Sequence, residues 1–244
     1  MRRRFLVKGF EEGRAVLQGE EAHHLSRVLR AQAGQLYELS DGEQVFLARI
    51  ERATREVVEF ALLERVAAAV PSLEATLLLA IVKFDRFEWA IEKATELGVT
   101  RIVPLAAARS EKALLLAAPK RAARWQKILL ESSQQSRRLR PPILTGVEKP
   151  ATAFAGQDGR PIRLLLSERT GAARLRHVLK GKSACAAVFA VGPEGGWIEE
   201  EFACAERSGF QEVSLGPQVL RTETSVIAGL AAIQYALGDS SDLD

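Results

Sequence analysis

The chain has 244 residues, a length that corresponds to one large domain or to two modest ones. Its composition, 47% hydrophobic and 27% charged, is that of an ordinary soluble globular protein. Two cysteines are too few for a disulfide framework, no apolar run reaches the roughly 18 residues of a membrane span, and the first residues lead into no signal peptide. We therefore expect a cytoplasmic protein.

The first 70 residues are predicted to form a small β-barrel with one helix. Turn signals separate five strand-like segments, at residues 4–7, 14–17, 35–39, 44–50 and 56–63. Asp41-Gly42 lies between two of them and favours a tight hairpin, because such a turn needs a positive φ. The helix is expected at about residues 20–29, and Pro71-Ser72 is expected to be the linker that follows this domain.

From residue 73 to about residue 240, strands and helices alternate, which predicts an open parallel sheet with helices on both faces. Segment 75–82 is apolar throughout, as in a strand that is covered on both sides. Segment 85–97 has apolar residues at helical spacing, with Asp85 and Glu88 resembling a capping box. The further elements are predicted as strands 101–105, 162–167, 184–191 and 212–215 and as helices 119–135, 198–208 and 222–237.

The net charge of +3 is distributed unevenly along the chain. Residues 1–72 hold 11 basic and 11 acidic residues, whereas residues 119–140 hold 7 basic residues and one acidic residue. A solvated helix face is one interpretation, but the last three arginines precede Pro141-Pro142 in a segment typical of a loop. Arginine and lysine are the usual contacts to phosphates, so this pattern favours RNA binding. The predicted RNA-binding residues are Arg2, Arg3, Arg4, Arg27, Arg30, Arg137, Arg138 and Arg140.

A glycine-rich loop, Gly192-Pro193-Glu194-Gly195-Gly196, follows the strand predicted to end at Val191. Three glycines let the backbone approach a ligand closely, whereas a plain turn would need only one. The loop is not G-x-G-x-x-G, and Gly181-Lys182-Ser183 lacks the earlier glycine of a phosphate-binding loop. Three glutamates at the start of the next helix would repel a phosphate. We therefore expect a ligand with little or no net negative charge.

Two further loops follow strands, one beginning at residue 167 and one at Leu215. Open α/β sheets bind ligands at the carboxyl ends of their parallel strands. The three loops together are therefore the predicted binding site.

Together, the motifs Gly192-Pro193-Glu194-Gly195-Gly196-Trp197 and Leu215-Gly216-Pro217-x-Val219-Leu220-Arg221-Thr222-Glu223-Thr224 resemble the RsmE family. The segments His23-His24-Leu25-x-Arg27-Val28-Leu29-Arg30 and 83–99 agree with this resemblance. The family consists of bacterial methyltransferases of the SPOUT superfamily, which methylate N3 of a uridine in 16S ribosomal RNA. The resemblance implies an α/β fold: a PUA-like RNA-binding β-barrel at 1–70, then a trefoil-knotted, parallel-sheet methyltransferase domain at 73–240.

The resemblance also implies a homodimer that binds S-adenosylmethionine in the knot and acts on small-subunit ribosomal RNA or on the assembled small subunit, without a metal. A sulfonium cation is compatible with a loop that holds Glu194 and no lysine. The implied cofactor-binding residues are Leu166, Ser167, Gly192, Glu194, Gly195, Gly196, Leu215, Gly216 and Leu220.

Two residues are candidates for catalysis. Methyl transfer to N3 needs a deprotonated uridine, and Arg221 is the candidate that stabilises its negative charge. Glu223 is the candidate that orients Arg221 or accepts the proton. The alternative for the two residues is a structural ion pair that shapes the loop.

Two other functions remain open. One is ribose 2′-O-methylation of transfer or ribosomal RNA by an enzyme of the same superfamily, and the other is a non-catalytic RNA-binding assembly factor. The run 220–224 and the His23-His24 helix favour uridine methylation over ribose methylation, and the intact glycine loops argue against a protein without catalysis.

Overall fold

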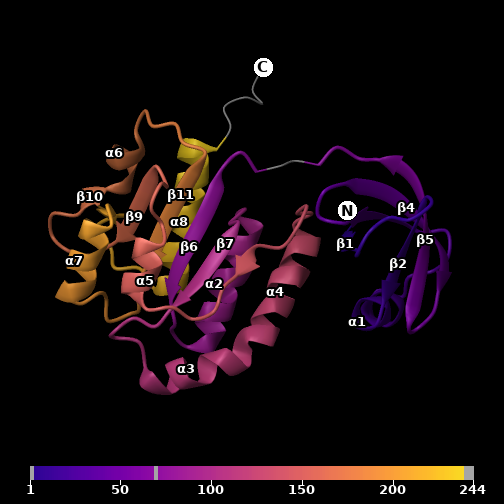
Figure 1. The fold of residues 1–244 in the computed structure, drawn as a ribbon, viewed down its shortest axis with the longest axis horizontal. Coiled ribbons are helices and arrows are strands. Elements are labelled where there is room, and N and C mark those ends of the chain that lie inside the picture. Colours follow the sequence, from indigo (N-terminus) through magenta and orange to yellow (C-terminus); the bar gives the residue numbers. More distant parts are fainter. Residues whose placement is uncertain (1–2, 69–70, 239–244) are drawn as a thin grey trace. The chain divides into compact units, whose positions relative to one another are not determined.

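The computed structural model describes residues 3–68 and 71–238 (Figure 1). They belong to two compact units. The N-terminal unit comprises residues Met1–Val70 and Ser133–Pro141, and the C-terminal unit comprises Pro71–Ser132 and Pro142–Asp244. The sequence boundary near residue 70 does not foresee that Ser133–Pro141 joins the first unit. The predicted domain ends at 1, 70 and 240 lie outside the described residues.

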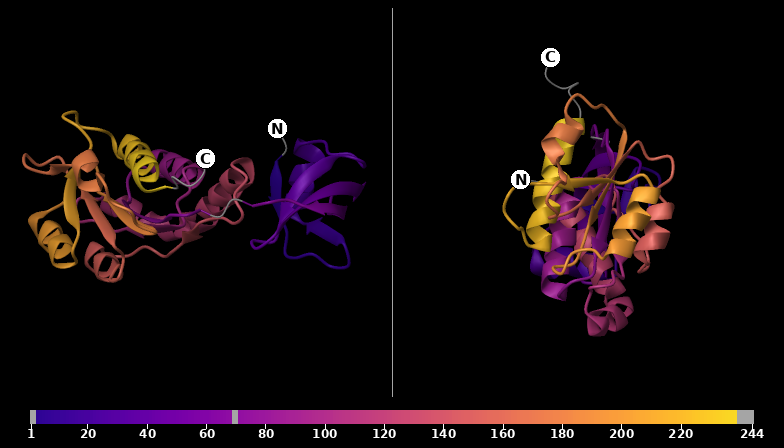
Figure 2. Two further views of the ribbon diagram at one scale, coloured as in Figure 1. Left: turned by 90° about the horizontal axis from the view of Figure 1, so that it is seen from above. Right: turned by 90° about the vertical axis from the view of Figure 1, so that its left-hand side faces the viewer.

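The N-terminal unit is built on a curled five-stranded sheet with the strand order β1-β3-β4-β5-β2 (Figure 2). Its strands are β1 (Arg4–Leu6), β2 (Arg14–Gln18), β3 (Leu36–Ser40), β4 (Val45–Ala53) and β5 (Val57–Arg65). The β1–β3 pair is parallel and the other pairs are antiparallel. Phe5, Leu39, Ile50 and Phe60 form the centre of its core. The bounds of the five strands agree with the predicted bounds to within a few residues, so the prediction of these strands is confirmed.

One helical segment interrupts these strands, as predicted. It starts as helix α1 (Glu20–His23) and continues as a π-helix (His24–Val28), a form that the sequence pattern does not indicate. The predicted hairpin turn is also confirmed. Gly42 has a φ of 95°, and Oδ1 of Asp41 accepts hydrogen bonds from the backbone N–H groups of Glu43 and Gln44 at 2.9 and 2.8 Å.

A seven-stranded sheet forms the centre of the C-terminal unit, with the order β10-β12-β9-β11-β6-β7-β8. Its strands are β6 (Glu74–Ala80), β7 (Arg101–Leu105), β8 (Ile143–Leu144), β9 (Ile162–Leu166), β10 (Ala173–Arg174), β11 (Ala186–Val191) and β12 (Gln211–Ser214). Every neighbouring pair is parallel. The predicted open parallel sheet is therefore confirmed.

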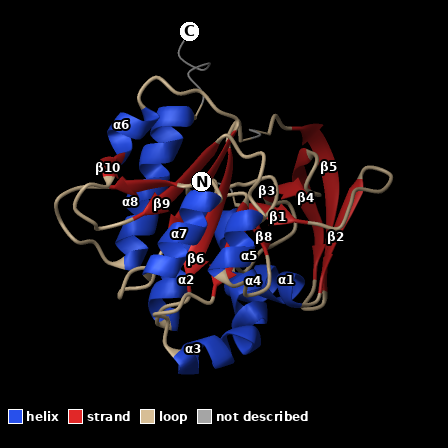
Figure 3. Cartoon of the chain, turned by 60° about the vertical axis from the view of Figure 1, so that its left-hand side comes forward, coloured by secondary structure: helices blue, strands red, loops and turns tan. Residues whose placement is uncertain are grey.

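Helices cover both faces of this sheet (Figure 3). Alternate residues of the apolar strands point to opposite faces, so Phe189 of β11 packs in one core and Val188 in the other. The Phe189 face is covered by α2 (Phe84–Glu96), α4 (Ala122–Gln135), α6 (Leu175–Leu179) and α8 (Thr222–Leu237). The Val188 face is covered by α5 (Pro150–Ala155) and α7 (Glu199–Arg207). The short α3 (Lys112–Ala117) and a 3₁₀ turn (Ala118–Arg121) precede α4.

The structure differs from the sequence prediction at the start of α2. Lys83 is the N-cap residue and makes no side-chain capping hydrogen bond, and Asp85 lies within the first turn, so the predicted Asp85–Glu88 capping box is wrong. Glu88 instead accepts a hydrogen bond from Nε of Arg124 at 2.7 Å. The trefoil knot stays a prediction. Among the described residues, no helix has the length and apolar character needed to cross a membrane.

Candidate cofactor-binding site

The three predicted loops meet at the carboxyl ends of the parallel strands, because they follow the adjacent strands β12, β9 and β11. They surround a cavity of about 570 Å³. A smaller cavity of about 70 Å³ shares Leu166, Ser167 and Leu220 with it and extends along the loop after β12. The sequence prediction that these loops converge is therefore confirmed by their geometry.

Eight of the nine predicted cofactor-binding residues line one or both of these cavities. They are Leu166, Ser167, Gly192, Glu194, Gly196, Leu215, Gly216 and Leu220. The ninth residue, Gly195, is covered by Arg109, whose Nη1 donates a hydrogen bond of 2.6 Å to the carbonyl oxygen of Gly195. A Cβ atom at Gly195 would lie 3.3 Å from the Cβ of Arg109, so this glycine allows Arg109 to pack on the loop.

Trp197 connects two of the loops. Its Nε1 donates a hydrogen bond of 3.0 Å to the carbonyl oxygen of Leu166 at the end of β9. Its indole ring lies where a Cβ of Gly192 would point, since such a Cβ would meet three ring atoms at 3.0–3.3 Å. The glycine loop itself closes through a hydrogen bond of 2.8 Å from the Gly196 N–H to the Pro193 carbonyl, with Gly196 at a φ of 71°. Gly192 and Gly196 are thus required for different reasons, close packing and turn geometry.

The glutamates at the start of α7 have separate partners. Glu201 is buried, and its two carboxylate oxygens accept hydrogen bonds from the N–H groups of Ala108 and Ile198 at 2.8 and 3.0 Å. Glu199 forms an ion pair with Arg169, which lowers the pKa of Glu199 and raises that of Arg169. The guanidinium of Arg169 also stacks over the ring of Phe202 at 3.7 Å. Two of the three glutamates that were predicted to repel a phosphate are therefore bound to other groups of the protein.

Arginines from distant parts of the chain also line the larger cavity. Arg86 of α2 pairs with Glu194 of the glycine loop, and Arg109 and Arg169 lie nearby. Arg169 belongs to the predicted loop after β9, whereas Arg86 and Arg109 lie outside the three predicted loops. Arg86 belongs to the segment 83–99 that carried the family resemblance, and this was the available signal for it. The charge of Glu194 is consequently balanced inside the site.

Arg221 and Glu223 lie at the junction between the third loop and α8. Arg221 is the exposed N-cap residue of α8 and lines the larger cavity. Glu223 is only 5% exposed, lines neither cavity, and its Oε2 has no hydrogen-bond partner in the described part of the chain. Both residues are described, and no ion pair joins them. The structural ion pair weighed as an alternative is therefore not formed.

Three of the predicted RNA-binding arginines are engaged within the N-terminal unit. Arg4 is 6% exposed, and its Nε and Nη2 donate to Oε2 of Glu38 at 3.1 and 2.9 Å. Its Nη1 donates to the carbonyl oxygen of Arg137 at 2.5 Å, and Nη1 of Arg137 lies 3.8 Å from Oε1 of Glu38. Burial lowers the pKa of Arg138 to about 10. Arg4 and Arg137 thus attach the segment Ser133–Pro141 to the curled sheet.

The other predicted RNA-binding residues are more accessible. Arg27, Arg30 and Arg140 are exposed, and Arg3 is half-buried beside His24, whose Nε2 lies 3.4 Å from Nη1 of Arg3. Arg2 lies outside the described residues. Three of the predicted RNA-binding arginines are therefore exposed on the surface of this unit. Among the described residues, no group of three or more metal-ligating side chains is present.

Comparison with known proteins agrees with this site. Residues 70–234 match the RNA methyltransferase domain family. The ribosomal RNA small subunit methyltransferase E of Synechocystis is 34% identical over 93% of this chain and 74% of its own length, and that of Bacillus subtilis is 29% identical over 89% and 88%.

Two solved structures cover almost the whole chain. The ribosomal RNA small subunit methyltransferase E of Neisseria gonorrhoeae, bound to S-adenosyl methionine, gives a TM-score of 0.88 at 31% identity and covers 99% of this chain and 100% of its own. A Legionella pneumophila methyltransferase in complex with the same cofactor gives 0.87 at 28% identity, with 98% and 99% covered. The chain belongs to the ribosomal RNA small subunit methyltransferase E family.

Proposed function

We propose that the protein transfers a methyl group from S-adenosylmethionine to N3 of a uridine in small-subunit ribosomal RNA. The observation that carries this proposal is the cavity formed by the loops after β9, β11 and β12, in a chain of this methyltransferase family. Ribosomal RNA is found in the bacterial cytoplasm, so the reaction would take place there.

The residues present fit this cofactor. A cavity of about 570 Å³ is within the range of about 300–1,000 Å³ that is usual for small-molecule sites. Leu166, Leu215 and Leu220 supply apolar surface for an adenine ring, and Gly192 leaves main-chain atoms accessible. The Arg86–Glu194 pair offers both charges to a zwitterionic amino-acid group. When bound, the cofactor supplies an electrophilic methyl group on a sulfonium.

Arg221 is the residue that we assign to the developing negative charge. Uridine N3 is nucleophilic once its proton is lost, and the charge then spreads to O2 and O4. Arg221 is at the wall of the cavity, exposed, and without an ion-pair partner in the described chain. A cation that is already placed beside the reacting base stabilises the anion without reorganising at the moment of reaction.

Glu223 is the residue that we assign to proton acceptance. In the described part of the chain its buried Oε2 has no hydrogen-bond partner, a state that costs about 1–3 kcal/mol and is relieved when a donor binds to this oxygen. Because Glu223 does not pair with Arg221, it is free of the orienting role that the sequence also allowed. Because Glu223 lies behind the cavity wall, the proton on N3 would reach this carboxylate through one intervening water, and the ionised base is held by Arg221.

A methylation assay on small ribosomal subunits that lack the modification tests this function. We expect one methyl group per subunit, on N3 of a uridine, when the modified position is mapped by mass spectrometry of nuclease fragments. A methyl group on a ribose 2′-oxygen would support the ribose methyltransferase instead. Tight cofactor binding without any methylation would support the assembly factor.

We further propose that the protein is a homodimer through α8 and α2. After Glu223, α8 has no charged residue, and a helix that is apolar on all sides is normally buried on all sides. Yet Tyr235 of α8 is 94% exposed and Trp89 of the neighbouring α2 is 44% exposed. A second copy of the chain would cover this face. Sedimentation should give a dimer for the wild type and a monomer for Trp89→Glu combined with Tyr235→Glu.

The exposed arginines of the N-terminal unit are the proposed RNA contacts of that unit. Arg27, Arg30 and Arg140 are available for phosphates, whereas Arg4 has a buried carboxylate partner. Replacing these three residues by alanine should weaken RNA binding and leave cofactor binding unchanged.

A further inference from the structure

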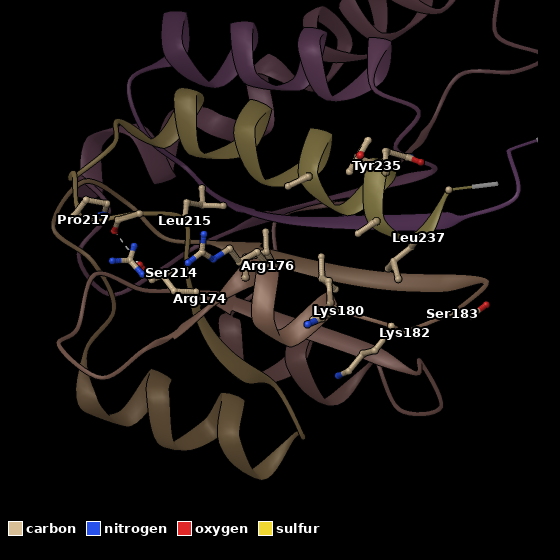
Figure 4. A pocket seen from close by; sticks show the side chains of 18 residues that line it. Arg174, Arg176, Lys180, Lys182, Ser183, Ser214, Leu215, Pro217, Tyr235 and Leu237 are labelled. Carbon is tan, nitrogen blue, oxygen red and sulfur yellow. Dashed lines mark hydrogen bonds between the residues drawn. The ribbon is translucent and has the colours of Figure 1, made fainter. Parts of the chain in front are cut away.

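A groove next to the cofactor site lies between the β10–α6 region and the end of α8, where Tyr235 of the proposed dimer contact is one of its lining residues (Figure 4). Its volume is about 1300 Å³. The loop residues Ser214 to Pro217 form one of its walls and also line the smaller cofactor cavity. The groove is therefore next to the proposed reaction site, although it shares no residue with the larger cavity.

The charged residues of this groove are all basic. Arg174, Arg176, Lys180 and Lys182 line it, and no aspartate or glutamate does. In the part of the chain that the structure describes, none of the four forms an ion pair, and Arg176 donates only to the adjacent His177 at 3.2 Å. In the cofactor cavity, by contrast, Arg86 and Arg169 are paired with glutamates.

Helix α6, which packs on the sheet, positions the basic side chains of the groove. Leu175, Val178 and Leu179 of α6 are buried in the core of the sheet, so the intervening side chains face outward. Arg176 is an exposed residue of α6, and the exposed Lys180 caps the C-terminal end of this helix. In Figure 4, Arg174 and Arg176 lie beside Ser214, whereas Lys180 and Lys182 lie farther along the groove. The result is an extended row of positive charge.

We propose that this groove binds the phosphate backbone of the RNA substrate, a contact of the C-terminal unit that adds to the arginines of the N-terminal unit. The inference rests on the proposed function, because it takes RNA as the substrate. A groove of this volume is too large for a single small anion, and a row of unpaired cations matches a chain of phosphates. Desolvating these cations against apolar surface or another basic protein face would be unfavourable.

The test compares three triple variants of the full-length protein. The groove variant is Arg176→Ala, Lys180→Ala, Lys182→Ala, in which all three side chains are exposed. The matched control is Lys112→Ala, Lys149→Ala, Arg207→Ala, which removes the same charge from exposed positions outside the groove. A charge-preserving variant carries Arg176→Lys, Lys180→Arg and Lys182→Arg. Binding of protein-free small-subunit ribosomal RNA is measured at several salt concentrations, and cofactor affinity is measured by calorimetry.

We expect the groove variant to bind RNA at least tenfold more weakly at low salt, with unchanged cofactor affinity. Its dependence of log K on log salt should be shallower by about 2 to 3, since each lost phosphate contact removes about 0.7 to 0.9. The control and the charge-preserving variant should behave like the wild type. Wild-type affinity and salt dependence in the groove variant, or an equal loss in the control, would overturn the proposal.

Two further outcomes separate this inference from its neighbours. A change from dimer to monomer in the groove variant would identify the groove as a contact between copies and would also overturn the proposal. Wild-type protein that binds RNA through the groove but methylates no small subunits would overturn the proposed reaction alone.

Discussion

The indole ring of Trp197 occupies the side of Gly192 on which any other residue would carry its Cβ, and the same indole donates a hydrogen bond to the carbonyl of Leu166. One tryptophan thus fixes the distance between the loops after β11 and β9. Since these loops form the cofactor cavity, the pair Gly192–Trp197 sets its shape.

Gly192→Ala should therefore damage the cavity directly. The new methyl group would meet ring atoms at 3.0–3.3 Å and displace the indole, with a loss of about 1–3 kcal/mol of stability. Calorimetry should show cofactor affinity reduced by about tenfold or more, the equivalent of 1.4 kcal/mol. Gly146→Ala is the control, because its Cβ would meet nothing within 4 Å. An unchanged affinity in Gly192→Ala would contradict the assigned role of this contact.

Arg221→Ala should separate binding from chemistry. Arg221 touches the cavity only at its wall, so cofactor affinity should stay near that of the wild type. The loss of a preorganised cation should lower kcat by about 10²–10³-fold. Single-turnover assays on methyl-deficient small subunits measure this, with Arg207→Ala on α7 as the control for an exposed arginine. Wild-type turnover would remove Arg221 from the mechanism.

Glu223→Gln should lower the rate in a pH-dependent manner. Glutamine has nearly the same shape but accepts no proton, so kcat should fall by about 10²–10⁴-fold near neutral pH. The remaining rate should rise steeply with pH, because uridine N3 then ionises without help from the protein. Glu200→Gln, on the exposed first turn of α7, is the control. A uniform reduction at every pH would point to a structural role instead.

Arg4→Met should lower the free energy of unfolding of the N-terminal unit and should not only weaken its RNA contacts. The substitution leaves the buried carboxylate of Glu38 with Arg137 alone, at 3.8 Å, and breaking such a buried pair costs about 3–5 kcal/mol. Denaturant unfolding should show this loss, and Arg14→Met on an exposed position of β2 should not. The double variant Arg4→Met, Glu38→Met should recover much of the stability. Without such recovery, the ion pair is not the cause.

Gly229→Ala should destabilise the C-terminal unit. A Cβ at this position of α8 would lie 2.3 Å from two ring atoms of Phe189 on β11, so the helix has to move away from the sheet. We expect a loss of about 1–3 kcal/mol, measured by thermal unfolding. Adding Phe189→Leu should restore part of it by making room, and a failure of this second change to help would argue against the contact.

Much of the fold follows from local patterns in the sequence. The bounds of β7 and α8 are those predicted, because both are largely apolar runs of the length expected for a buried strand and a long helix. The short α5, α6 and β10 were not predicted, since elements of two to six residues are too short to show a period. The place of Ser133–Pro141 in the N-terminal unit depends on contacts such as Ser40 Oγ to the Leu139 carbonyl at 2.7 Å, which no local pattern records.

Only the part of the candidate site that leaves a local pattern in the sequence was predicted. Glycine loops after strands are visible in the sequence, and they do converge. Arg86 and Arg109 reach the cavity from elements outside the three predicted loops, so their approach depends on the tertiary fold. The basic residues of the groove were visible as four cations between positions 174 and 182, but Gly181-Lys182-Ser183 was compared only with a phosphate-binding loop.

The three loops of the cofactor cavity come from strands that are adjacent in the sheet but up to about fifty positions apart in the chain. The cavity consequently exists only when the whole edge of the C-terminal unit is assembled, and a bound cofactor favours that assembled state by mass action. At one hundred times its dissociation constant, it should add about 2.7 kcal/mol to the unfolding free energy of this unit. The N-terminal unit, which contributes no residue to the cavity, should melt at the same temperature with or without it.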